Sequence, residues 1–248
     1  MAAKLQGDES IDVLHRDVSE APSDAWMPAP QSVPSGCPPG LEYLTTTDQV
    51  IVHQIVEVIE AVSGFETKNM YKIKNAMGQT MYSVLEESTC VIRQCCGHSR
   101  PFELAISNGQ GTEVMRLVRP FRCDNTLGFC CLQELEVQCP PGETIGWIKQ
   151  NCSLFSPRFS VTDASGQVVY RIKGPCFSCK WCDVEFRVTS SEDNEHVGTI
   201  TKQWSGLSKE YFSDADNFGI LFPSDTDVKM KAILIGAVFL IDFMYFEN

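Results

Sequence analysis

The chain has 248 residues, enough for one substantial domain with a tail, and 43% of them are hydrophobic. Its formal net charge of −12 argues against a general nucleic-acid binder, because phosphate contacts need clustered lysine and arginine. The same charge argues against simple electrostatic attraction to an anionic leaflet. Any membrane attachment is therefore expected to be apolar or covalent, and DNA is not an expected partner.

Residues 1–36 are predicted to form a disordered tail, because the segment is acidic, contains several prolines and has few large apolar side chains. The first ten residues, MAAKLQGDES, lack the basic and apolar regions of a secretory signal. The twelve cysteines lie partly in tight groups, which is typical of reduced, acylated or metal-binding thiols rather than of a disulfide framework. We therefore expect an intracellular protein whose folded domain covers residues 37–248.

Short strands are predicted from residue 38 onward. The segment Val50–Val62 fits a helical stripe as well as a strand, and its density of valine and isoleucine favours the strand. Residues 71–85, 102–118 and 158–173 each consist of two alternating apolar runs separated by Asn or Asp with Gly, which predicts three β-hairpins. Leu135 and Val137 alternate with polar residues in a further strand, and Pro140–Gly142 turns the chain. This spacing favours an antiparallel sandwich or barrel.

The C-terminal segment, about 228–246, is predicted to be one helix around a run that is apolar on every side. The run consists of Ala232, Ile233, Leu234, Ile235, Gly236, Ala237, Val238, Phe239, Leu240 and Ile241. Such a helix must be buried in protein or in lipid. A membrane span needs about 20 apolar residues, and Asp242 would cost roughly 3 kcal/mol at a bilayer centre. The residues therefore favour a helix enclosed by a β-barrel, and a membrane span is the alternative.

The segment 214–225 partly matches a twelve-residue calcium loop, with aspartates at the first, third and last positions and Gly219 at the sixth. Its ligand positions are Asp214, Asp216, Phe218, Ile220, Phe222 and Asp225. The two phenylalanines supply no side-chain oxygen, so we expect weak binding if Ca²⁺ is the ligand. The competing interpretation is that the aspartates cap or turn the chain before the helix.

Two groups of cysteines are further candidates. Cys176, Cys179 and Cys182 have the spacing of a zinc knuckle, but a zinc ribbon needs a second knuckle, so Zn²⁺ is not favoured over reduced thiols at a strand end. Cys130 and Cys131 lie beside apolar residues, which suits S-acylation at a membrane face, whereas simple packing is the alternative.

No catalytic motif is found. The four histidines are scattered, and the nucleophile-elbow, phosphate-loop and zinc-protease patterns are missing from the sequence. We therefore expect a protein that is not an enzyme in the covalent sense.

Several strings together resemble the phospholipid scramblase family over residues 38–246. They are Pro38–Leu44, Tyr71–Asn75, Arg119–Cys123, Cys131–Glu134, Asp214–Gly219, Asp227–Ala232 and Ile241–Met244. The resemblance implies a mainly β, tubby-like fold, in which a closed antiparallel barrel of about twelve strands surrounds the hydrophobic C-terminal helix. It also implies calcium-stimulated, ATP-independent movement of phospholipids in both directions between leaflets, with Ca²⁺ on the segment 214–225.

The resemblance further implies a palmitoylated lipoprotein at the cytoplasmic face of the plasma membrane. The cysteine cluster of the family is reduced here to Cys123, Cys130 and Cys131, and its nuclear-import segment keeps only Lys202 and Trp204, so nuclear entry is not expected. One short helix offers no polar path for a head group, so self-association or protein partners would be required. The alternative is a membrane-tethered, tubby-like adaptor that binds phosphoinositides or proteins.

Overall fold

The computed structural model describes residues 25–30, 32–55, 69–87, 100–122, 132–176, 184–203 and 217–246. A short 3₁₀ helix, η1 (Glu42–Thr46), precedes twelve strands and one long helix, α3 (Val228–Tyr245). The strands are β1 (Gln49–Ile55), β2 (Met70–Asn75), β3 (Thr80–Glu86), β4 (Phe102–Ser107), β5 (Glu113–Arg119), β6 (Glu134–Gln138), β7 (Thr144–Gln150), β8 (Arg158–Asp163), β9 (Val168–Lys173), β10 (Val184–Ser190), β11 (His196–Gln203) and β12 (Asn217–Leu221). Each strand pairs with its sequence neighbours, and β1 pairs with β12, which closes the barrel.

The three predicted hairpins are confirmed as β2–β3, β4–β5 and β8–β9. Their turns share one design, because in each the side chain of the last Asn or Asp accepts hydrogen bonds from two backbone N–H groups of the turn. A glycine at positive φ follows in every case: Gly78, Gly111 and Gly166. Only glycine adopts this conformation without steric cost, so the turn chemistry fixes where each strand reverses.

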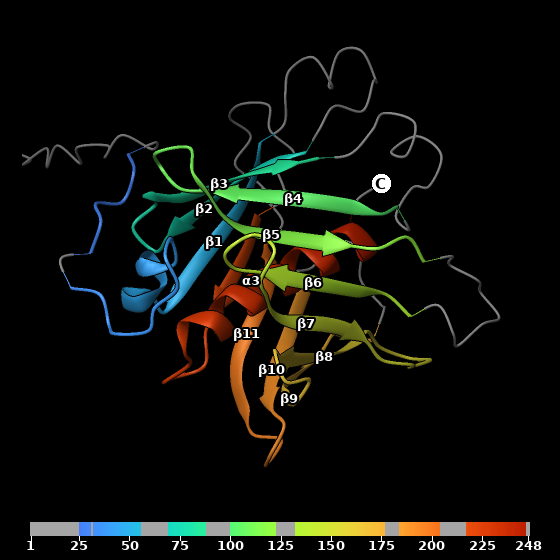
Figure 1. The fold of residues 1–248 in the computed structure, drawn as a ribbon. Coiled ribbons are helices and arrows are strands. Elements are labelled where there is room, and N and C mark those ends of the chain that lie inside the picture. The colour runs from blue at the N-terminus through green and yellow to red at the C-terminus, as the bar shows by residue number, and fades with distance from the viewer. Residues whose placement is uncertain are drawn as a thin grey trace, which may run out of the picture.

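Because the barrel runs up and down, its connections alternate between two ends. We call the turn end the one where β2–β3, β4–β5, β6–β7, β8–β9 and β10–β11 are joined by short turns. At the opposite end, where β1, β3, β5, β7, β9 and β11 finish (Figure 1), successive strands are separated by more residues in the sequence, and we call it the loop end.

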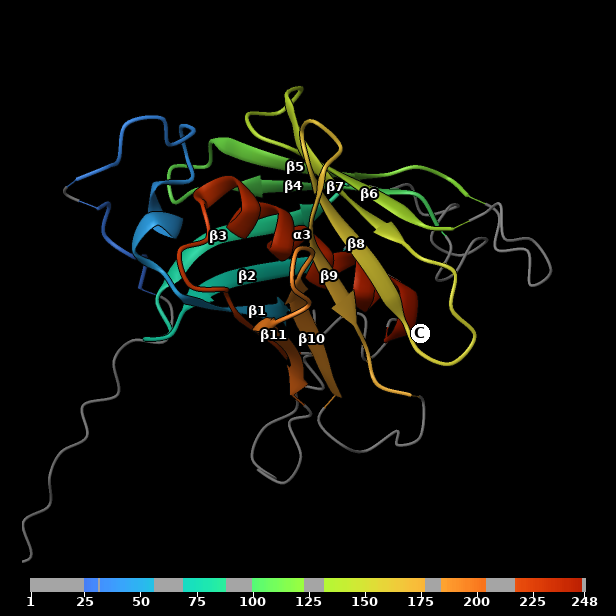
Figure 2. The same cartoon turned by 90° about the horizontal axis from the view of Figure 1, so that it is seen from below.

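Helix α3 runs through the barrel from the turn end to the loop end (Figure 2). The residue before it, Asp227, caps the helix, because its side chain accepts hydrogen bonds from the backbone N–H groups of Lys229 and Met230. All ten residues of the apolar run, 232–241, are buried. The predicted helix and its enclosure by a barrel are therefore confirmed.

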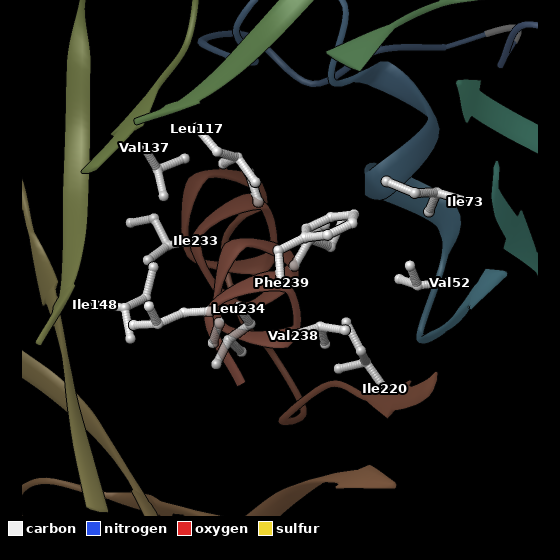
Figure 3. Close-up of a cluster of buried hydrophobic side chains, with 14 of the residues drawn as sticks. Val52, Ile73, Leu117, Val137, Ile148, Ile220, Ile233, Leu234, Val238 and Phe239 are labelled. Atoms are coloured by element: carbon white, nitrogen blue, oxygen red, sulfur yellow. The ribbon is translucent and has the colours of Figure 1, made fainter. Parts of the chain in front are cut away.

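The core is formed where α3 meets the inward faces of the strands. Figure 3 shows Ile233, Leu234, Val238 and Phe239 of the helix surrounded by strand side chains. Those labelled on the strands are Val52, Ile73, Leu117, Val137, Ile148 and Ile220, and each is at most 1% exposed. Burying one such side chain contributes about 1.5–3 kcal/mol, so the helix supplies the apolar filling that the barrel requires.

The structure describes part of the strand expected over 50–62 and part of the tail expected over 1–36. The strand expected over 50–62 is present as β1, and residues 56–62 lie outside the described part. The tail expected over 1–36 overlaps the packed region, because Thr80 exchanges backbone hydrogen bonds with Ala25 and Met27, and the ring of Trp26 lies against Gly109. Ala25, Trp26 and Met27 therefore contact the barrel although they precede residue 37, and the domain boundary itself stays a prediction.

Candidate functional site: the plugged barrel and its two ends

The middle of the barrel is filled by side chains. A Cβ atom placed on Gly236 would lie only 3.0 Å from Cγ2 of Val137 and 3.2 Å from Cδ1 of Ile148. On the facing strand, a Cβ atom on Gly146 would lie 2.5 Å from Cδ1 of Ile233. The two glycines therefore allow helix and strands to approach closely, and this layer leaves no room for a lipid chain beside α3.

At the turn end, the helix carries one buried cation. Lys231 is 6% exposed, and its Nζ donates hydrogen bonds to the backbone oxygens of Leu44 at 3.1 Å and Thr47 at 2.7 Å. The carboxylate of Asp48 lies 3.7 Å away, and the ammonium lies over the ring of Phe222. Lys231 thereby ties the first turn of α3 to η1 and to the start of β1.

At the loop end, the helix carries a buried carboxylate. Asp242 is 3% exposed, and its Oδ2 accepts a hydrogen bond of 3.1 Å from the hydroxyl of Tyr71 on β2. The ring of Tyr71 also packs edge-on against Phe239. Asp242, which argued from sequence against a membrane span, is thus bonded to the wall of the barrel.

Further charged side chains close the loop end over the helix. Arg100 and Glu86 form a buried ion pair at 3.2 Å, and the Arg100 guanidinium lies over the ring of Phe243. Arg119 donates two hydrogen bonds to Oε1 of Gln133. Lys202 is 1% exposed, with its Nζ 4.1 Å from the ring centre of Phe246. The aromatic end of α3 is therefore covered by cations, an arrangement that stabilises both partners.

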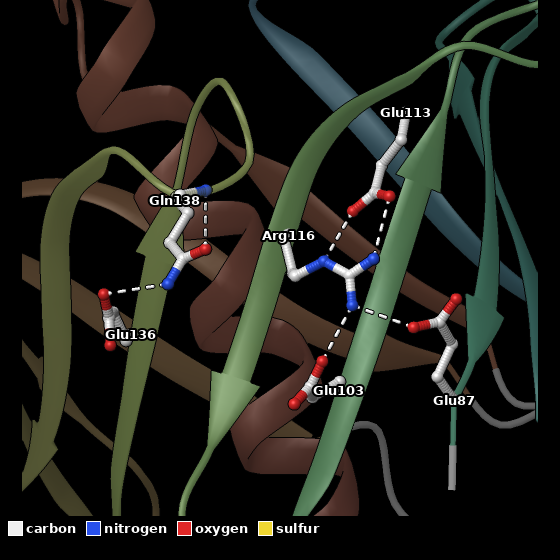
Figure 4. A network of polar contacts seen from close by, with 7 residues as sticks. Glu87, Glu103, Glu113, Arg116, Glu136 and Gln138 are labelled. Atoms are coloured by element: carbon white, nitrogen blue, oxygen red, sulfur yellow. Dashed lines mark hydrogen bonds and ion pairs between the residues drawn. The ribbon is translucent and has the colours of Figure 1, made fainter.

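Outside the barrel, a charge network joins three strands (Figure 4). The guanidinium of Arg116 on β5 bonds to carboxylates of Glu113, Glu103 and Glu87 at 2.7–2.8 Å. The hydrogen bond to Glu113, followed by that to Glu87, raises the pKa of Arg116 above its ordinary value. Beside it, the amide of Gln138 donates to Glu136. These contacts brace the wall rather than form a site for a reaction.

The calcium candidate does not fold as one loop. Asn217–Leu221 is strand β12, paired with β1 and β11, and Asp214 and Asp216 lie outside the described residues. Phe218, Ile220 and Phe222 are buried, and Asp225 follows β12 at the turn end. The expectation of a loop across 217–221 is therefore wrong, because the alternating apolar residues pair and bury as a strand. Calcium binding by the neighbouring aspartates stays a prediction.

Of the candidate thiols, only Cys176 lies in the described part, where it is exposed and its Sγ donates to the backbone oxygen of Phe155 at 3.0 Å. The others, Cys179 and Cys182 together with Cys123, Cys130 and Cys131, fall outside the described residues. Within the described ranges, no cluster of three His, Cys, Asp or Glu side chains is arranged to hold a metal. Zinc binding and S-acylation remain predictions.

The buried thiol missed by sequence reasoning is Cys139, at the start of the β6–β7 turn. It is 1% exposed, and burial raises the pKa of its thiol to about 11. Of the nuclear-import remnant, Lys202 is enclosed in the barrel and Trp204 lies outside the described residues. Whether the protein enters the nucleus stays a prediction.

Sequence reasoning also missed the buried charges around α3. Lys231, Lys202 and Arg119 look in the sequence like ordinary surface cations, and only the barrel topology brings them against backbone oxygens and rings. The sequence signal that could have found them was position along a strand, since Lys202 lies two residues after the buried Ile200 and so shares the inward face of β11.

Among the described residues, the helices lack the combination of length and hydropathy that a membrane span requires.

Comparison with known proteins identifies the family to which this chain is similar. The family model described as scramblase matches residues 27–248. The chain is 48% identical over 246 residues to phospholipid scramblase 2 of Bos taurus, covering 97% of this chain and 84% of that protein. It is 51% identical over 224 residues to phospholipid scramblase 1 of Homo sapiens, covering 90% of this chain and 70% of that protein.

A third relative, phospholipid scramblase 4 of Homo sapiens, is 44% identical over 228 residues, covering 90% of this chain and 68% of that protein. No solved structure matches the chain. The family match includes all twelve strands and α3. The closed barrel around a C-terminal helix is the tubby-like fold that the sequence resemblance implied. The chain belongs to the scramblase family.

Proposed function

We propose that this protein moves phospholipids between the two leaflets of a membrane, in both directions, without ATP and without making or breaking covalent bonds. The observation that carries the proposal is the identity of about half the aligned residues with proteins named phospholipid scramblases, along a match that spans the whole barrel. Phospholipids and the membrane are the partners that follow from it.

The filled barrel limits how lipids can be moved. A head group needs a polar route through hydrocarbon, because each unsatisfied polar group there costs several kcal/mol. The interior of the barrel is occupied by α3 and its apolar contacts, so it offers no such route. Movement is therefore expected along the outer surface of the barrel, or between copies of the protein that perturb the bilayer together.

Calcium is proposed as the stimulus, with Asp214 and Asp216 as the ligands that the chain provides. The two carboxylates are hard oxygen donors spaced as in calcium sites. They immediately precede β12, which is hydrogen-bonded on both sides. Asp225 lies beyond the other end of that strand, so it belongs to a different part of the surface.

Attachment to the cytoplasmic face of the plasma membrane is proposed to involve acylation of Cys123, Cys130 and Cys131. Arg122 and Leu132 flank this segment, and the Arg122 side chain donates to the backbone oxygen of Leu132 at 2.9 Å. The described residues on either side of the candidate cysteines, Arg122 and Leu132, lie at the loop end. Two acyl chains anchor firmly where one is marginal.

The test is a dithionite assay on liposomes that contain the purified full-length chain and a fluorescent phospholipid. We expect wild-type protein to expose inner-leaflet label to dithionite in calcium, and Asp214→Ala to lose most of the stimulation. Asp193→Ala is the matched control, because Asp193 is an exposed aspartate at the turn end. Equal calcium stimulation in wild type and Asp214→Ala would remove the proposed trigger, and no protein-dependent movement at all would contradict scrambling.

The second candidate function is a non-catalytic, membrane-tethered adaptor that binds phosphoinositides or proteins. It is favoured by one observation: a helix that fills the barrel cannot itself line a lipid pathway. Vesicle binding without any lipid movement in the same assay would support this function over scrambling.

A further inference from the structure

The loop between β7 and β8, at the loop end, presents two consecutive apolar side chains to solvent. Leu154 is 82% exposed and Phe155 is 75% exposed, the two highest values among the large exposed hydrophobic residues of the described chain, with Met77 equal to Phe155. Single exposed apolar residues are ordinary on protein surfaces. Two adjacent ones in a loop are less so, and here the next two residues, Ser156 and Pro157, are already buried.

The loop is held in place by its base. The backbone N–H of Asn151 donates to the oxygen of Arg158 at 2.8 Å, and Ser156 and Pro157 are buried. Cys176, which follows β9, donates to the oxygen of Phe155 at 3.0 Å. The exposure of the tip therefore results from a bonded conformation of the loop.

A row of cations lies beside this tip on the outer face of the barrel. In the strand register, Arg158 of β8 faces Lys173 of β9, and Lys173 faces Arg187 of β10. All three side chains are exposed. Like charges directly opposite one another destabilise a sheet, so the row has a cost in the isolated protein. An anionic surface would remove that cost.

The carboxylates of the loop end leave two members of this row, Arg158 and Lys173, without an ion pair among the described residues. On the surface of that end, Glu87 and Glu103 are ion-paired with Arg116, and Glu134 with Arg122 and Lys149. Glu185 pairs with Arg187 at 3.3 Å. Among the described residues, no ion pair involves Arg158 or Lys173.

The turn end has the opposite character. Its exposed carboxylates, in the described turns and at the helix cap, include Glu143, Glu192, Asp193, Glu195, Asp225 and Asp227. Although the net charge of the chain is −12, its surface charge is uneven, because the apolar tip and the unpaired cations Arg158 and Lys173 lie together at the loop end. That combination is typical of a protein that docks on an anionic membrane, with apolar side chains below the head groups and cations among them.

We propose that the tip Leu154–Phe155 and the row Arg158, Lys173 and Arg187 form the surface that docks on an anionic phospholipid bilayer. The inference deepens the proposed function, because it names the part of the barrel that faces the membrane. The loop end then lies toward the lipid, the end of α3 at Phe246 lies near it, and the acidic turn end faces away.

The experiment is co-sedimentation of the full-length chain, free of acyl groups as verified by mass spectrometry, with vesicles. One set contains phosphatidylcholine alone and the other also contains phosphatidylserine. We expect tighter binding to the second set, weakened by salt because screening shortens the reach of charges. Phe155→Ser is expected to weaken binding by at least about tenfold, and Lys173→Gln by about fivefold.

The controls are matched in exposure and placed at the turn end. Met77 is 75% exposed, as Phe155 is, so Met77→Ser removes an equally exposed apolar side chain. Lys229→Gln removes an exposed cation of that end. Both are expected to bind vesicles like wild type. All four substitutions are at exposed positions, and circular dichroism with thermal unfolding checks that each variant folds.

Three results would overturn the inference. They are failure of the wild type to prefer anionic vesicles, wild-type binding by Phe155→Ser and Lys173→Gln, or an equal loss in the turn-end controls. If instead Phe155→Ser abolishes a dimer seen by ultracentrifugation while vesicle binding is unchanged, the surface joins two copies of the chain and the inference is wrong. Lipid movement is scored separately, so binding without movement contradicts the proposed function and leaves the docking surface supported.

Discussion

Individual buried polar residues fix the ends of α3. Lys231 is held by two backbone oxygens and Asp242 by the hydroxyl of Tyr71, so each end of the helix is bonded to a different part of the wall. Hydrogen bonds to charged groups contribute about 1.5–3 kcal/mol, and they are directional. They therefore set the depth of the helix in the barrel, which apolar contacts alone would not do.

Replacement of Lys231 by methionine tests this role. Lys231→Met keeps much of the apolar stem but leaves the oxygens of Leu44 and Thr47 without their charged donor. We expect the free energy of unfolding to fall by about 1–3 kcal/mol in a urea titration. Lys229→Met, on the exposed side of the same turn, should change it by less than about 0.5 kcal/mol. Equal stabilities of the two variants would contradict the assigned role of Lys231.

Cys139 should behave as an inert thiol. Because burial raises its pKa to about 11, almost no thiolate forms at pH 8 in the folded protein. Iodoacetamide at that pH is expected to modify the exposed Cys152 and Cys176 and to spare Cys139, as read by peptide mass spectrometry. Denatured protein, in which all three react, is the control. Rapid labelling of Cys139 in folded protein would show that the β6–β7 turn opens.

The same thiol gives a pH dependence with a defined sign. The folded state holds the Cys139 proton more tightly than the unfolded chain, whose thiol ionises near the ordinary value of 9.0. The contribution of Cys139 to stability is therefore complete below about pH 9 and is lost as the pH rises toward 11. Cys139→Ala should fall less steeply than wild type over that interval in unfolding experiments.

At the scale of elements, the helix and the strands are fitted by glycines. Gly236 lies where α3 packs closely against β5, β6 and β7, with Val137, Ile148 and Leu117 around it. Gly236→Leu is expected to lower the free energy of unfolding by at least about 1–3 kcal/mol, because the added side chain overpacks this layer. Gly236→Ala should change it far less, since a gain in helix propensity of about 1 kcal/mol offsets the tight contact with Val137. A Gly236→Leu variant as stable as wild type would mean that the helix has room around it.

The same elements show what the sequence could predict. The hairpins were predictable because Asn75, Asn108 and Asp163 bond the backbone of their own turns, a local interaction that the sequence displays directly. The apolar run of α3 was predictable because it has no polar face. The closure of the sheet was expected only from the family resemblance, since the pairing of β1 with β12 joins residues far apart in the chain and no local pattern displays it.

β12 was misinterpreted for a physical reason. Its flanking aspartates suggested an ion-binding loop, whereas Phe218 and Ile220 alternate with polar or small residues and bury in the barrel. Alternation with period two was the signal that favoured a strand. The buried cations around α3 could not be predicted in the same way, because their partners are backbone oxygens and rings contributed by distant elements.

At the scale of the whole molecule, the closed barrel leaves no free strand edge, so its outer surface and its two ends are what can interact with other molecules. The interior is occupied by the molecule's own C-terminal helix. The proposed interaction with lipid therefore involves the outside of the barrel, and the proposed docking surface places the loop end toward the membrane. On this proposal, the protein perturbs a bilayer from its surface or as an assembly of copies.

The central claim is that α3 remains inside the barrel when the protein is on a membrane. The most direct test is a glycosylation-acceptor tag placed after Asn248 and expressed in cells. A helix enclosed by the barrel keeps the tag on the side of the membrane where the barrel lies, which is the cytoplasmic side in the proposed attachment, so we expect no glycan. A control with about 20 leucines inserted before the tag should be modified, because that segment is long enough to span. Glycosylation of the tag without the insertion would show that α3 crosses the membrane and would contradict this account.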